Sequence, residues 1–138
     1  GLPDTHVEFF GGLDTAHASA VLASGDLALA PYDDGVSTRR TTLAAQLQHG
    51  RPVIGTDGPS TDDLLRHSPA LDLVPLTRPT VAEDVVARLD AALDDPARRS
   101  AMSTAARDLY DSSLSWPTIA AAYASLVRPG APAPNRNA

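Results

Sequence analysis

An Ala- and Leu-rich segment with helical spacing begins with four consecutive polar residues, Arg39, Arg40, Thr41 and Thr42. A guanidinium binds phosphate oxygens through a planar fork, and a hydroxyl adds another hydrogen bond. The first N–H groups of a helix lack intrahelical partners and carry partial positive charge. Together these features predict an anion site, and phosphate is the ligand that suits it.

The preceding loop offers backbone groups to the same site. Gly35 lets the chain approach a ligand closely, and the N–H groups of Val36 and Ser37 could join the Ser37 hydroxyl in holding a diphosphate. A second interpretation stays open. In it the loop is solvated, the two arginines neutralise Asp33 and Asp34, and a threonine caps the helix.

Other reactive groups are sparse in the sequence. There is no Cys, and the four His show no metal-ligand spacing. Asp33 and Asp34 are adjacent and tend to point apart, so we expect an acidic turn and no metal site. The sequence contains no phosphate-binding P-loop and no nucleophile elbow. Trp116 precedes Pro117 at a helix start, and we expect it to be a packing anchor.

Short apolar runs bounded by Gly and Pro predict the strands that position these residues. We expect strands at 7–10, 27–30, 53–56 and 71–74, the last weakened by Asp72. Because helical patterns alternate with these runs, the sequence predicts an α/β, Rossmann-like parallel sheet of three to four strands with flanking helices.

Helical spacing and capping residues predict the remaining elements. A helix at 16–24 follows a cap at Asp14 or Thr15, and a short one follows a cap at Ser60 or Thr61. The later helices are expected at 81–93, from 96 to about 110, and from 116 to 126 as a C-terminal segment. Their expected buried stripes are Val81, Val85, Leu89 and Ala92 or Leu93 in the first, and Met102, Ala105, Ala106 and Leu109 in the second.

Composition limits the function classes. A length of 138 residues fits one domain or part of a larger one, here residues 1–128, and 129–138 has the composition of a disordered tail. The net charge of −6 argues against a nucleic-acid partner. All eleven basic residues are Arg, which suggests a GC-rich, bacterial genome. No run is apolar enough to span a bilayer and no signal peptide is visible, so we expect a cytoplasmic protein.

Several short motifs, in order along residues 6–127, resemble the C-terminal part of the donor-binding domain of a GT-B glycosyltransferase, most like glycosyltransferase family 4. The matching pieces are Val7-x-Phe9-x-Gly11, Asp-Leu-Ala-Leu-Ala-Pro at 26–31, His-Gly-Arg-Pro-Val at 49–53, Thr56-Asp57-x-Pro59, Asp-Pro-x-Arg-Arg at 95–99 and Ser115-Trp116.

The resemblance implies transfer of a sugar from a nucleotide-diphosphate sugar to an unknown acceptor, without cofactor or metal. It places the donor diphosphate at Gly35, Val36 and Ser37 and the nucleobase pocket at Phe10 and Gly11. Arg39 and Arg40, with Thr41 and Thr42, would hold the phosphates and stabilise the leaving group. The implied partner is the N-terminal acceptor-binding domain of the same enzyme, which allows for a peripheral membrane contact.

One departure from the family keeps alternatives open. Retaining members carry two glutamates at the positions of Ser37 and Ala45, and the second normally grips the donor ribose. A nucleotide-sugar 2-epimerase of the same architecture is one alternative. A degenerate, non-catalytic GT-B binding module is the other, favoured by Ala45 and opposed by the Arg-Arg-Thr-Thr cluster.

Overall fold

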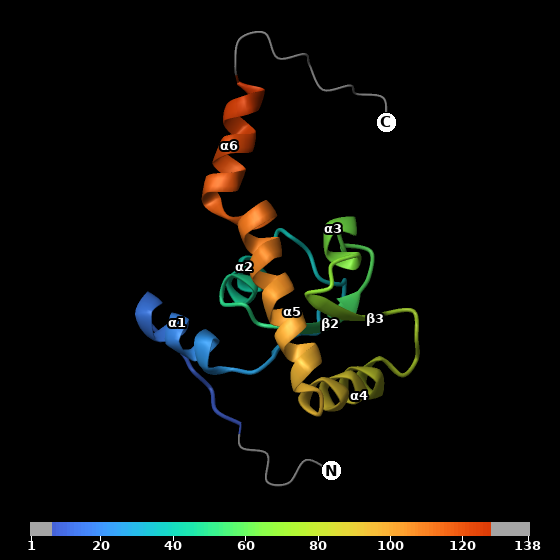
Figure 1. The fold of residues 1–138 in the computed structure, drawn as a ribbon. Helices are drawn as coiled ribbons and strands as arrows, with labels where there is room; N and C mark the ends of the chain where they lie inside the picture. The colour runs from blue at the N-terminus through green and yellow to red at the C-terminus, as the bar shows by residue number, and fades with distance from the viewer. Residues whose placement is uncertain (1–6, 128–138) are drawn as a thin grey trace.

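The computed structural model describes residues 7–127 (Figure 1). The predicted tail at 129–138 lies outside these residues. The core is a three-stranded parallel sheet in the order β1-β2-β3. Its strands are β1 (Ala28–Ala30), β2 (Val53–Asp57) and β3 (Leu71–Pro75). The α/β class and three of the expected strands are thereby confirmed.

The expected strand at 7–10 is wrong. These residues belong to no strand and are exposed, with Phe9 92% accessible. The local pattern was β-prone, but a strand is stable only when a neighbour accepts its backbone hydrogen bonds. Among the described residues, β1 pairs only with β2, and no strand lies beside 7–10.

The helices follow the predicted order, and side-chain caps explain the starts of three of them. They are α1 (Thr15–Ser24), α2 (Thr41–Gln48), α3 (Asp63–Arg66), α4 (Val81–Leu93), α5 (Pro96–Leu109), the π-helical turn η1 (Tyr110–Leu114) and α6 (Trp116–Leu126). Asp14 accepts a hydrogen bond from the His17 N–H at 2.9 Å, and Asp95 accepts one from the Arg98 N–H at 2.9 Å. These caps satisfy N–H groups that the helices leave open.

The predicted cap of α3 is wrong by one or two residues. Asp62 occupies the N-cap position, and its carboxylate is used elsewhere. The Thr61 hydroxyl instead accepts a hydrogen bond from the Gly58 N–H at 3.0 Å, within the loop that precedes the helix.

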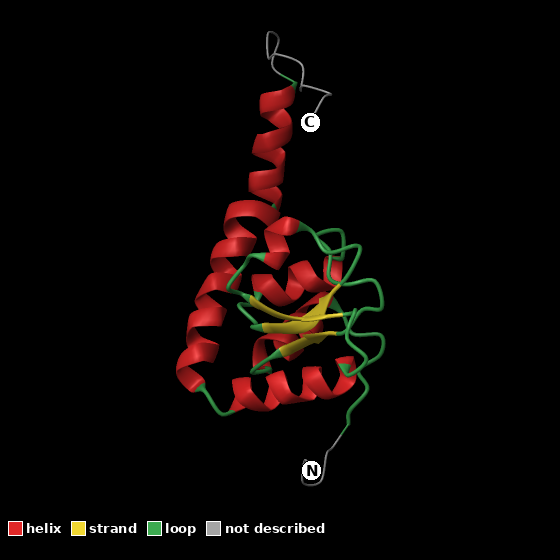
Figure 2. Cartoon of the chain, turned by 90° about the vertical axis from the view of Figure 1, so that its right-hand side faces the viewer, coloured by secondary structure: helices red, strands yellow, loops and turns green. Residues whose placement is uncertain are grey.

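Helices lie on both faces of the sheet (Figure 2). On one face α2, α3 and α5 close the main core, whose buried members include Ala30, Leu43, Val53 and Leu65. Helix α4 packs on β2 and β3. The expected stripe on α4 is only partly buried: Ala92 is inaccessible, whereas Leu93 is exposed.

Helix α6 extends away from the body of the molecule in both views (Figures 1 and 2). None of its residues is buried. Trp116, its first residue, is 79% exposed, so its expected role as a packing anchor is wrong. The residues that do pack at this corner are Ser115, which is buried and caps α6, and Leu114, which lies against the core.

Candidate functional site

Two loops meet at the carboxyl edge of the sheet, where open parallel sheets bind ligands. The first (31–40) follows β1, and the second (58–62) follows β2. The Val36 N–H donates to the Thr56 carbonyl at 3.0 Å, the Ser60 N–H donates to the Asp34 carbonyl at 2.9 Å, and the Thr38 N–H donates to Asp62 Oδ2 at 2.6 Å. These bonds hold the two loops together as one surface.

Gly35 is where the two loops touch backbone to backbone. Its φ is +91°, and a Cβ built there would lie 2.5 Å from the Gly58 nitrogen. The space beside Gly35 is therefore filled by the second loop. The sequence predicts a ligand in that space.

Val36 and Ser37 face inward. The Val36 side chain is fully buried in the core, and its N–H is already bonded to Thr56. Ser37 is 2% exposed, and its Oγ accepts hydrogen bonds from the Arg39 N–H and from Arg39 Nε, both at 3.4 Å. These residues set the shape of the loop, and the Val36 N–H is not available to a phosphate in this conformation.

Arg40 is held by neighbours within the loop. It forms an ion pair with Asp34, and its guanidinium carbon lies 3.9 Å from the centre of the Tyr32 ring. The Tyr32 hydroxyl in turn hydrogen bonds to Thr42 Oγ1 at 2.9 Å. A hydrogen bond from the Ser60 hydroxyl and the charge of Arg40 lower the pKa of Asp34. This arrangement agrees with the alternative interpretation for Arg40, with Asp34 as the partner.

Arg39 and Thr41 are different, because both are exposed at the start of α2. Arg40 occupies the N-cap position without a side-chain cap, and the N–H groups of Thr41 and Thr42 donate to no acceptor in the part of the chain that the structure describes. The structure thus brings Arg39, Thr41 and Thr42 together around open donors at the positive end of the helix.

Asp62 holds the residues just before α2 in place through a hydrogen bond to the backbone. Its carboxylate accepts from the Thr38 N–H, and that bond, with the nearby charge of Arg39 among the smaller causes, lowers its pKa. A lowered folded-state pKa stabilises the fold above the unfolded value, about 3.9, and the contribution is lost as pH falls through the folded pKa.

We expect Asp62→Ala to lower the free energy of unfolding by about 1–2 kcal/mol at pH 7, as for loss of one charge-assisted hydrogen bond. Urea denaturation should show this difference shrinking below pH 4, where wild type also loses the charge. Asp63→Ala removes an exposed carboxylate next to it and is the control. A constant difference from pH 7 to pH 2 would contradict the assignment.

Phe10 and Gly11 do not form a pocket with this site. Phe10 is 53% exposed, and no atom lies within 4 Å of a Cβ built on Gly11. The missing strand at 7–10 explains this, since the resemblance placed both residues at the end of a strand in the sheet.

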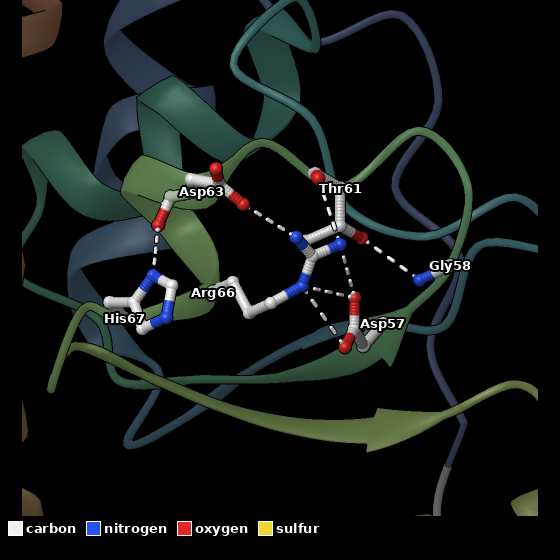
Figure 3. Close-up of polar contacts among 6 residues, drawn as sticks. All are labelled: Asp57, Gly58, Thr61, Asp63, Arg66 and His67. Atoms are coloured by element: carbon white, nitrogen blue, oxygen red, sulfur yellow. Dashed lines mark hydrogen bonds and ion pairs between the residues drawn. The ribbon is translucent and has the colours of Figure 1, made fainter.

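A second polar cluster, which the sequence analysis did not identify, follows β2 (Figure 3). Arg66 on α3 donates to Asp57 Oδ1 from Nε at 3.1 Å and from its terminal nitrogen at 3.0 Å, and it also pairs with Asp63. The hydrogen bond that Arg66 donates to Asp57 is the largest cause of its raised pKa. Because Arg66 also donates to the Thr61 carbonyl, it braces the 58–62 loop.

Residues 7–127 also bear on metal binding and membrane insertion. No group of three or more His, Asp or Glu side chains there is arranged to hold a metal ion. No helix among them has the length and apolar character to cross a membrane.

Comparison of the chain with protein-family models, with curated proteins and with solved structures found no match.

Proposed function

We propose that the start of α2 binds the diphosphate of a nucleotide sugar, as the donor-binding portion of a GT-B glycosyltransferase. The observation that carries the proposal is the group of open donors at Thr41 and Thr42 beside the exposed Arg39, at the carboxyl edge of a parallel sheet. The motif order along the sequence supports the choice of a nucleotide sugar over other phosphates.

The proposed chemistry is electrostatic. As the sugar leaves, negative charge develops on the nucleoside diphosphate, and fixed N–H groups and a guanidinium stabilise it. In the proposed mechanism, Arg39 is the guanidinium that contacts the diphosphate. Arg40, already paired with Asp34, holds the loop in shape through Tyr32 and Thr42. The acceptor would be bound by the other domain of such an enzyme.

One observation favours a second candidate, the degenerate binding module. The donors that the family resemblance assigned to Gly35 and Val36 are engaged within the protein, with Tyr32 and Thr56 as acceptors. Calorimetric titration of uridine, guanosine and thymidine diphosphates separates the candidates, because a degenerate module would give no heat with any of them.

Arg39→Ala is the variant that tests the site. We expect it to weaken diphosphate binding about tenfold, the effect of one charge-assisted contact at an exposed position. The melting temperature should change only slightly, because the bond from Arg39 Nε to Ser37 Oγ is long at 3.4 Å. Arg107→Ala is the matched control, because it removes the same charge beside Gly50, just beyond the other end of α2. If both variants bind as wild type does, the diphosphate is not held at the start of α2.

A further inference from the structure

A groove of about 310 Å³ runs between α2 and the corner where η1 meets α6. Thr38 and Thr41 line it at the start of α2, and Ala45 and Gln48 line it farther along the helix. Trp116 lines it from α6. The volume falls in the range of small-molecule sites. Thr41 belongs both to this groove and to the proposed diphosphate site, so the two are continuous.

The lining indicates what the groove would accept. None of its residues is charged, so it favours a neutral group. Threonine hydroxyls and the Gln48 amide offer both donors and acceptors, which suits the polar edge of a heterocycle. Ala45 leaves space where a long side chain would fill it. Trp116 lines the groove and is 79% exposed, so its indole is accessible to a ligand there.

A large exposed indole beside uncharged polar groups suits a planar ring, because bases stack on aromatic side chains whatever their sequence identity. We propose that this groove holds the nucleoside of the donor, with its base stacked on Trp116. The inference rests on the proposed function, since the diphosphate at the start of α2 brings the nucleoside within reach. It replaces Phe10 and Gly11 as the location of the base.

The chain provides its own probe, because Trp116 is its single tryptophan. Titration with uridine diphosphate should quench or shift its emission, whereas inorganic pyrophosphate, which lacks a base, should leave the emission unchanged. Calorimetry on the same samples gives the affinity independently of the indole.

Trp116→Ala should weaken uridine diphosphate binding about tenfold or more and leave pyrophosphate affinity unchanged, in line with the loss of one stacked base. Tyr123→Ala is the matched control: it removes another exposed aromatic side chain of α6, one that is 67% accessible and outside the groove lining. Circular dichroism should show both variants folded, since neither side chain is buried.

The outcomes separate the two proposals. If uridine diphosphate binds in an Arg39-dependent way but Trp116 emission and Trp116→Ala affinity do not change, the base lies elsewhere and only the groove inference is overturned. If neither nucleoside diphosphates nor pyrophosphate bind, the proposed function falls and the groove inference falls with it.

Discussion

Gly35→Ala should destabilise the fold by roughly 2–5 kcal/mol, the sum of a strained backbone and an overpacked contact. The residue has φ +91°, which L side chains rarely adopt, and the new Cβ would lie 2.5 Å from the Gly58 nitrogen and 2.9 Å from its Cα. These are backbone atoms, so relief requires the two loops to separate. Separation would also weaken the Val36–Thr56 and Ser60–Asp34 bonds.

Gly25→Ala is the control for this variant. Gly25 follows α1 with φ −74°, and a Cβ there would have its nearest neighbour at 3.6 Å, an ordinary contact. We expect a change within about 0.5 kcal/mol, or a slight gain from reduced freedom of the unfolded chain. Equal stability of Gly35→Ala and Gly25→Ala in thermal and urea denaturation would show that the loops do not press together as described.

Local patterns were sufficient for the parts of the fold that depend on neighbours in sequence. The apolar run before Pro31 and the run after Pro52 became β1 and β2. Burial on both faces, which such runs suit, holds for β2, whereas Leu29 of β1 is 48% exposed. Asp95 followed by Pro96 capped α5 as expected. These features need only a few adjacent residues, and the chemistry of each is fixed locally.

Features that depend on distant partners could not be read from spacing. Arg39 and Arg40 were equivalent in the sequence, but Arg40 meets Asp34 and the Tyr32 ring while Arg39 stays exposed. Likewise, the spacing of Arg66 and Asp57 does not predict their pairing, because the pair forms only when α3 packs near the end of β2. Trp116 stays exposed because α6 buries none of its residues against the part of the chain that the structure describes.

Asp72 joins elements of the fold, although its position in an apolar run suggests a weakened strand. It interrupts an apolar run and was expected to weaken the strand there. In β3 its side chain is only 8% exposed, and its two carboxylate oxygens pair with Arg88 on α4 and Arg98 on α5. One buried carboxylate thus joins the sheet to two helices that follow it.

We therefore expect Asp72→Ala to cost roughly 2–3 kcal/mol, below the 3–5 kcal/mol typical of a broken buried pair because water still reaches both arginines. Their side chains are 40% and 39% exposed. Arg88→Ala should cost about 1 kcal/mol, because Asp72 keeps Arg98. Asp90→Ala, which removes an exposed carboxylate from α4, should change stability by less than about 0.5 kcal/mol.

The order of the three variants in urea denaturation decides whether the carboxylate joins these elements. Removing the shared acid leaves two cations facing each other, whereas removing one base leaves a paired acid, so the acid must be the more costly loss. If Arg88→Ala were as damaging as Asp72→Ala, the effect would come from packing of the arginine stem on β3, since a long side chain also covers apolar surface. An Asp72→Ala variant as stable as Asp90→Ala would show that water solvates both arginines as well as the carboxylate does. In that case α4 and α5 would pack on the sheet without help from Asp72.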